Sequence, residues 1–121
     1  MTNSVKIEMP HPIAVIIDPE GGDVPDFVDD ALVMATDSGL LVTCQGYVDG
    51  PTEFVLGNST DVDPGTRPAF EGKLKTPSRR LAIETSEGDA ILEVPTQGTN
   101  TVVRVWTNAL EDPDKVIVGV D

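Results

Sequence analysis

His11 and Cys44 are the residues best suited to covalent chemistry, because each is the only one of its kind among the 121 residues. A thiol–imidazole pair would need the two side chains to meet in space. His11 lies between two prolines, whereas Cys44 lies in an alternating apolar stretch that is typical of a buried strand. A buried cysteine is usually an inert core residue. We therefore predict no catalytic pair.

Carboxylates are the other groups that could do chemistry, and calcium is the metal that would use them. Two loops offer oxygen ligands: Asp18, Glu20 and Asp23 in one, and Asp61 and Asp63 in the other. Neither loop has the ligand spacing of an EF-hand, and aspartates in such loops are common turn formers. One cysteine and one histidine cannot complete a zinc site. We predict no metal and no other cofactor.

Catalysis by paired carboxylates, as in glycoside hydrolysis, is an open alternative. It would need a deep pocket in which two carboxyl groups have different pKa values. The chain has only five aromatic residues to offer a sugar, no G-x-S-x-G motif and no phosphate-binding loop. We therefore expect a protein that is not an enzyme.

The net charge of −13 is unevenly distributed along the chain. Between Lys6 and Arg67 there are 12 Asp and Glu residues and no Lys or Arg. A one-sided negative field attracts basic proteins and repels nucleic acid, whose phosphates require basic contacts. We expect a basic protein partner, such as a nuclease, and no direct binding of nucleic acid. The alternative is that the acidity serves only solubility.

Seven carboxylates of this block are our candidates for partner binding. They belong to a predicted helix start, a predicted hairpin and a predicted loop. The residues are Asp26, Asp29, Asp30, Asp49, Glu53, Asp61 and Asp63. The first three also suit a helix N-terminus, where the macrodipole favours negative charge, so they have a structural explanation as well.

A helical stripe runs from Val24 to Ala35, where apolar residues recur at spacings of three and four. Pro25 near its start and Gly39 after its end suit the two termini of a helix. The pattern predicts one short helix in this part of the chain.

Eight short segments of alternating or fully apolar character predict strands, with Gly-, Pro- and Asp-rich turns between them. This even spacing favours an all-β, single-domain antiparallel β-sandwich over βαβ units. The domain would span residues 1–121, with 1–12 as an extended N-terminal segment, Asp49–Pro51 as the turn of a hairpin and 58–68 as a loop. The predicted strands are 13–17, 40–47, 53–57, 70–75, 80–85, 90–94, 101–107 and 115–120.

Five residues within these strands are predicted to build the core, most of them facing inward: Ile83, Val103, Val105, Trp106 and Ile117. Residues 1–9 lack the apolar region of a signal peptide, and the longest apolar run, 13–17, is too short to span a membrane. We expect a cytoplasmic protein without membrane contact.

Three stretches carry a family resemblance. The first runs from Asp29 through Gly39 into Leu40–Thr43, the second is Thr52–Leu56, and the third joins Arg80–Glu84 and Gln97–Gly98 to the strand Arg104–Thr107. In this layout the chain resembles the competence protein J family, small bacterial inhibitors of the DNA-entry nuclease. The resemblance implies a non-enzymatic cytoplasmic protein that caps a nuclease. It assigns no inhibitory residue.

Two functions follow from these patterns. The first is an acidic protein-binding module, an inhibitor or immunity-type protein for a basic nuclease or toxin. The alternative is a structural or accessory β-domain, in which exposed strand edges pair to form a homo-oligomer.

Overall fold

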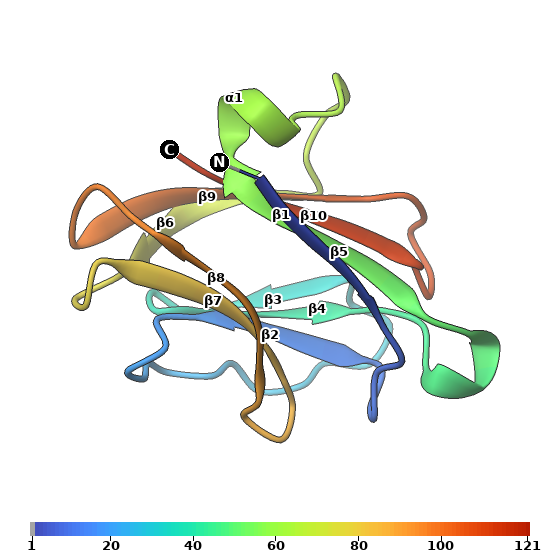
Figure 1. Cartoon of the computed structure of the whole chain (residues 1–121). Helices are drawn as coiled ribbons and strands as arrows, with labels where there is room; N and C mark the ends of the chain where they lie inside the picture. Colours follow the sequence, from blue (N-terminus) through green and yellow to red (C-terminus); the bar gives the residue numbers. More distant parts are fainter. Residues whose placement is uncertain (1) are drawn as a thin grey trace.

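The structure, a computed structural model, describes residues 2–121, which form ten strands and two one-turn helices (Figure 1). The strands are β1 (Thr2–Ile7), β2 (Ile13–Ile17), β3 (Val33–Ala35), β4 (Gly39–Thr43), β5 (Thr52–Asn58), β6 (Phe70–Lys75), β7 (Arg80–Thr85), β8 (Ala90–Pro95), β9 (Asn100–Thr107) and β10 (Lys115–Val120). The helices are the 3₁₀ turn η1 (Tyr47–Asp49) and the α-helical turn α1 (Ser59–Val62).

The strands form two five-stranded sheets, in the orders β1-β5-β10-β9-β6 and β3-β4-β2-β7-β8. The predicted β-sandwich class is confirmed. Two details differ from the prediction: β1 and β3 are additional strands, and β5 runs parallel to β10. The sequence of β1 is mostly polar and β3 has only three residues, so neither produced a strand signal.

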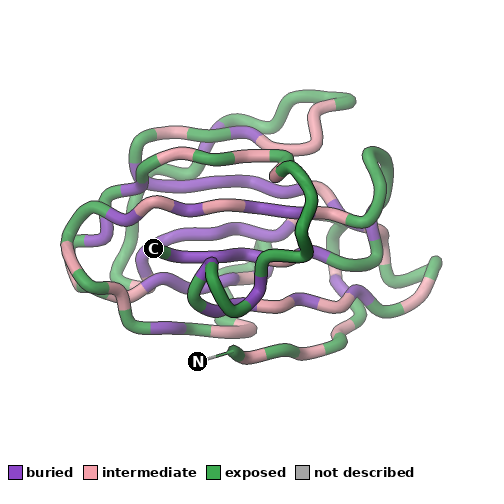
Figure 2. The backbone as a smooth tube through the Cα atoms, turned by 90° about the horizontal axis from the view of Figure 1, so that it is seen from above, coloured by how far each residue is buried: buried purple, intermediate pink, exposed green. Residues whose placement is uncertain are grey.

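The core lies between the inner faces of the two sheets and consists mainly of Val, Leu and Ile. Buried positions follow the strands, and exposed positions gather in the connecting loops (Figure 2). Ile83, Val103 and Val105 are fully buried in this core, as predicted, whereas Ile117 on β10 is only half-buried. Buried and partly buried positions alternate along much of β5 and β9, so in these strands the alternation reports the inner face.

The helix predicted between Val24 and Ala35 is absent from the structure, and this prediction was wrong. Residues 23–30 are irregular, and residues 33–35 pair with β4 as an edge strand. Met34 packs against Val15 and Leu41 on the outer face of the second sheet. Pairing with β4 and this packing stabilise residues 33–35 as a strand, whereas an isolated helix would lack the tertiary contacts from which short helices gain most of their stability.

The one α-helical turn within residues 2–121, α1, lies inside the predicted loop 58–68. It caps the outer face of the first sheet, where Ser59 lies against Gly119 of β10: a Cβ on Gly119 would come within 2.6 Å of the Ser59 hydroxyl oxygen. The segment that follows covers Trp106, whose indole N–H donates to the Thr66 carbonyl at 2.9 Å. Trp106 is thus buried as predicted, but it lies outside the core between the sheets.

The predicted hairpin around Asp49–Pro51 is also absent, because β4 and β5 belong to different sheets. Residues 44–51 cross from one sheet to the other at the right-hand end of the sandwich (Figure 1). Along this crossing the Cys44 and Gln45 amides donate to the carbonyls of Pro12 and Pro113. The prediction was wrong because the partners of β5 are β1 and β10, which lie far away in sequence.

The left-hand end of the sandwich in Figure 1 is named the paired end, because its ion pairs join Lys75 to Asp37 and Arg80 to Glu20 and Glu93. It is formed by residues 18–23, 36–38, 76–79 and 96–99 and by the adjoining strand ends. Lys75 forms an ion pair of 2.9 Å with Asp37 there, and Thr76 and Thr101 share a buried hydrogen bond of 2.8 Å.

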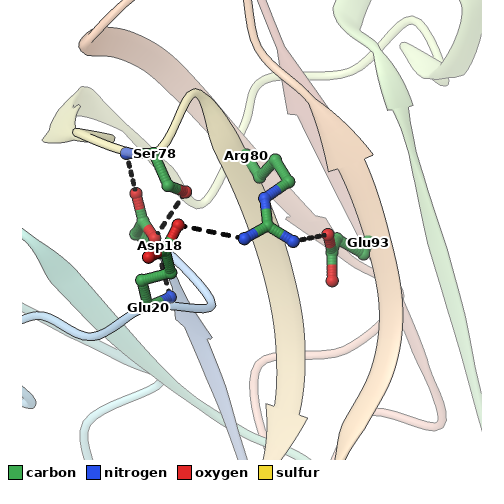
Figure 3. A network of polar contacts seen from close by, with 5 residues as sticks. All are labelled: Asp18, Glu20, Ser78, Arg80 and Glu93. Carbon is green, nitrogen blue, oxygen red and sulfur yellow. Dashed lines mark hydrogen bonds and ion pairs between the residues drawn. The ribbon is translucent and has the colours of Figure 1, made fainter.

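Asp18 is the buried anchor of the paired end (Figure 3). Its carboxylate accepts hydrogen bonds from the Ser78 N–H at 2.8 Å, the Ser78 hydroxyl at 2.7 Å and the Glu20 N–H at 2.8 Å. Arg80 bridges Glu20 at 3.1 Å and Glu93 at 2.8 Å. Burial alone would raise the pKa of Asp18, but these hydrogen bonds and the charge of Arg80 outweigh it and lower the pKa.

Candidate acidic docking site

The right-hand end of the sandwich in Figure 1 is named the acidic end. It is formed by residues 8–12, 27–32, 44–51 and 108–114, which contain no Lys or Arg. They carry seven carboxylates, more than half of the net charge of the chain: Glu8, Asp29, Asp30, Asp49, Glu111, Asp112 and Asp114. This end therefore projects a negative field into solvent.

Four of these carboxylates line one hollow, here named the acidic cleft, with a volume of about 420 Å³. Two segments far apart in sequence supply two each: Asp29 and Asp30 from the first, Glu111 and Asp112 from the second. The floor consists of Pro12, Thr43 and Cys44, and the exposed side chains of Phe27 and Leu110 also line it.

Hydrogen bonds to the strand ends hold the two segments in place. The Thr43 hydroxyl lies 3.3 Å from the carbonyls of Ala31 and Leu32, which ties the first segment to β4. The Gln45 N–H donates to the Pro113 carbonyl at 3.0 Å, which ties the second segment to the chain just beyond β4. Both walls of the cleft are therefore anchored to the same few residues.

Asp30 and Asp112 both have a left-handed backbone, with φ of 66° and 46°. Aspartate tolerates this conformation better than most residues, because its short side chain can interact locally. One carboxylate on each wall of the cleft therefore belongs to a residue with this uncommon backbone. A β-branched residue at either position would be strained.

No ion pair neutralises the acidic end within residues 2–121. The side chain of Asp114 accepts a hydrogen bond from the Asn108 amide, which is neutral. The nearest lysine along the chain, Lys115, lies 3.9 Å from Glu53. Lys6 is the register partner of Glu53 across β1 and β5, so the two lysines at this border lie beside the same carboxylate.

The predicted partner-binding residues are divided among several places. Asp29 and Asp30 lie in the cleft, Asp49 lies at the same end on η1, and Asp26 lines a neighbouring hollow. Glu53 is half-buried on the outer face of the first sheet, beside its lysines.

Asp61 and Asp63 lie at α1, outside the acidic end. The Asp63 carboxylate accepts a hydrogen bond from the Gly65 N–H at 2.7 Å, which shapes the turn after the helix. Glu111 and Asp112 were not among the predicted residues. The only sequence signal near them is the turn residue pair Asp112-Pro113, which says nothing about what lies beside it in space.

Cys44 is fully buried in the core cluster beneath the cleft. Burial raises the pKa of its thiol to about 12, the Thr52 hydroxyl opposes this, and the negative charge of Asp112 raises the pKa further. The thiol is therefore protonated and unreactive at neutral pH, whereas His11 is exposed to solvent.

Among the residues that the structure describes, no three His, Cys, Asp or Glu side chains are arranged to hold a metal ion. None of the helices within residues 2–121 has the length and the apolar character that a membrane span requires.

No protein-family model matches the chain, and no curated protein matches its sequence. Among solved structures, the fold is similar to the crystal structure of ComJ from Bacillus subtilis, an inhibitor of the DNA degrading activity of NucA. The TM-score is 0.63, and the match covers 98% of this chain and 93% of that chain at 12% sequence identity. At this identity the relationship is one of fold, and at that level it confirms the resemblance to the competence protein J family.

Proposed function

We propose that this protein binds and inhibits a nuclease, and that the acidic cleft is the centre of the binding surface. The observation that carries the proposal is the cleft itself. Four carboxylates without a basic partner among the described residues converge there, flanked by exposed Phe27 and Leu110. The fold likeness to an inhibitor of a nuclease supports the same function.

The electrostatic argument concerns the surface that a nuclease offers. An enzyme that degrades DNA must hold phosphates, so its substrate groove is lined with Lys and Arg. Converging carboxylates present a similar pattern of negative oxygens and accelerate encounter through long-range attraction. The protein would act in the cytoplasm and would not touch DNA itself.

The exposed apolar side chains give the surface a second contribution. Leu110 is 83% exposed on one wall of the cleft. Large apolar groups surrounded by polar ones are typical of protein interfaces, where they supply the affinity that charge alone does not. Charges would thus govern the association rate, and the apolar residues would govern the dissociation rate.

Affinity capture followed by an enzyme assay tests the proposal. The protein is immobilised, an extract of its own organism is applied at low salt, and bound proteins are released at high salt. We expect the released fraction to degrade DNA, and we expect added soluble protein to inhibit that degradation in a saturable manner. A released fraction without nuclease activity, or activity that the added protein leaves unchanged, would contradict the proposal.

A further inference from the structure

A second hollow, of about 400 Å³, lies on the other side of Phe27 from the acidic cleft. It opens on the outer face of the second sheet and is here named the apolar groove. Ile13, Val15 and Leu41 from β2 and β4 form its floor, and residues 24–27 form one side. Phe27 lines both hollows, so it is the wall between them.

The segment beside the groove covers the sheet incompletely. Val24, Phe27 and Val28 each remain about half exposed, although they lie next to apolar residues. Few hydrogen bonds hold this segment: the Val28 N–H points at the Met34 sulfur at 3.2 Å, and the Ala31 N–H donates to the Val28 carbonyl at 3.3 Å. Such a continuous half-exposed apolar surface is typical of a binding site.

Two carboxylates stand at the apolar groove, Asp26 and Glu84. Neither has an ion-pair partner among residues 2–121. Glu84 is half-buried, and burial, followed by the negative charge of Glu93, raises its pKa. A cation bound beside Glu84 would favour its charged form and so oppose the effects of burial and of Glu93 on this pKa. The groove is therefore apolar inside and negative at its edge, which complements an apolar side chain next to a basic one.

We propose that the acidic cleft and the apolar groove form one docking surface in two parts, divided by Phe27. A single segment of the partner places a Lys or Arg side chain in the cleft and an apolar side chain in the groove. This inference rests on the proposed function and specifies it further. It names the recognised element as a short stretch of the nuclease that carries a basic and an apolar residue close together.

Phe27 and Tyr47 provide a matched pair of variants. Both are aromatic residues of the acidic end, 53% and 58% exposed, but Tyr47 lines neither hollow. We expect Phe27→Ala to weaken binding of the captured nuclease about 10- to 100-fold, mainly through faster dissociation, as for the central aromatic residue of an interface. Tyr47→Ala should change it less than about 2-fold. Equal effects of the two substitutions would overturn the two-part surface.

Thermal unfolding of both variants serves as the folding control. Because each side chain is about half exposed, we expect both variants to keep the cooperative transition of the parent protein. If Phe27→Ala loses that transition, Glu84→Gln replaces it. Glu8→Gln is then the matched control, since Glu8 is an exposed carboxylate outside both hollows. Glu84→Gln should weaken binding clearly more than Glu8→Gln does, and equal effects or the reverse order would overturn the inference.

Synthetic peptides test the surface without the nuclease. Each peptide carries one Leu and one Arg separated by one to three glycines, and the comparison peptides replace Leu by Gly or Arg by Gln. Titration is followed by the backbone amide signals of residues 24–31 and 110–112 in NMR spectra. We expect one spacing to bind at least about ten times more tightly than either comparison peptide.

The outcomes separate the two proposals. If a nuclease binds and Phe27→Ala has no effect, the proposed function stands and the two-part surface is wrong. If no nuclease binds, the proposed function is wrong, and the peptide titration alone decides about the surface. Peptides that bind no better with both side chains than with one would overturn it. A dimer of the protein whose formation depends on Phe27 would also overturn the two-part surface, because a second copy of the chain would then occupy it.

Discussion

The paired end and the acidic end of the sandwich are both rich in carboxylates, but the two ends use them differently. At the paired end, Asp18 accepts three hydrogen bonds, and Arg80 holds two further carboxylates. At the acidic end, seven carboxylates have no ion-pair partner within the described part of the chain. The same side chains serve architecture in one place and face solvent in the other.

The difference shows which charges need a functional explanation. A carboxylate such as Asp18 stabilises the fold, because its hydrogen bonds join two loops that are 60 residues apart in sequence. A group of carboxylates without cations destabilises the fold by mutual repulsion. Such a group is therefore the better candidate for binding something outside the chain. The net charge of the whole chain does not distinguish these two kinds of carboxylate, because it adds them together.

The largest expected effect is a difference in stability between a variant at the paired end and a variant at the acidic end. Asp18→Ala removes the acceptor of three hydrogen bonds and leaves two loop N–H groups without it, so it should lower the free energy of unfolding by about 2–4 kcal/mol. Asp49→Ala at the acidic end should leave stability nearly unchanged. Denaturant unfolding of the two variants measures this. Similar losses in both would contradict the comparison.

The second prediction compares how strongly the carboxylates of the acidic cleft and carboxylates elsewhere affect the association rate. The cleft variant Asp29→Asn, Asp30→Asn, Glu111→Gln and Asp112→Asn should slow association with the nuclease about 10- to 100-fold at low salt. Asparagine suits the left-handed backbone of Asp30 and Asp112, so folding should be retained. Stopped-flow binding measures the rate, and high salt should reduce the difference.

The control for this variant removes the same number of charges from four predicted partner-binding residues that lie outside the cleft. It combines Asp49→Asn, Glu53→Gln, Asp61→Asn and Asp63→Asn. We expect a smaller loss of rate, because only Asp49 belongs to the acidic end. Equal losses in the two variants would mean that net charge, not the cleft, attracts the partner.

The third prediction concerns pH. The pKa of Asp18 is lower in the folded protein than in the unfolded chain, so its contribution to stability is complete above the unfolded value of about 3.9. That contribution is lost as the pH falls through the folded value. Denaturant midpoints measured from pH 6 down to pH 2 should therefore fall, and Asp18→Asn should flatten part of the fall. An unchanged slope in the variant would assign the acid sensitivity to other groups.

The smallest expected effect lies within the paired end itself. Lys75 and Asp37 form an ion pair of 2.9 Å, but both side chains are 63% exposed. Exposed pairs gain little, because water screens their attraction and both side chains lose mobility. Lys75→Met should therefore change thermal stability far less than Asp18→Ala does. A comparable loss would show that surface pairing, rather than the buried hydrogen bonds of Asp18, holds this end together.

Local patterns in the sequence were sufficient to predict much of the fold. Strands such as 101–107 and 115–120 were visible from their apolar content and their turn residues, and β9 and β10 lie there. The burial of Cys44 followed from its apolar neighbours. These features depend on residues a few positions apart, which is the range over which periodicity is informative.

The same local reasoning failed where distant residues competed with it. The stripe from Val24 to Ala35 has helical spacing, yet Met34 packs on the second sheet and residues 33–35 pair with β4. Residues 40–57 have the pattern of a hairpin, yet β5 pairs with β1 and β10. In both cases, backbone pairing and burial that involve remote strands outweigh a weak local preference.

By itself the sequence determined that this is an acidic β-sandwich with a resemblance to a family of nuclease inhibitors. Only the tertiary structure decided which carboxylates lie together. Asp30 and Glu111 are about 80 residues apart along the chain, and they line one cleft because both walls are anchored near the end of β4. Charge composition is a sum over the chain, whereas a binding surface depends on which side chains the folded backbone brings together and which cations it keeps away.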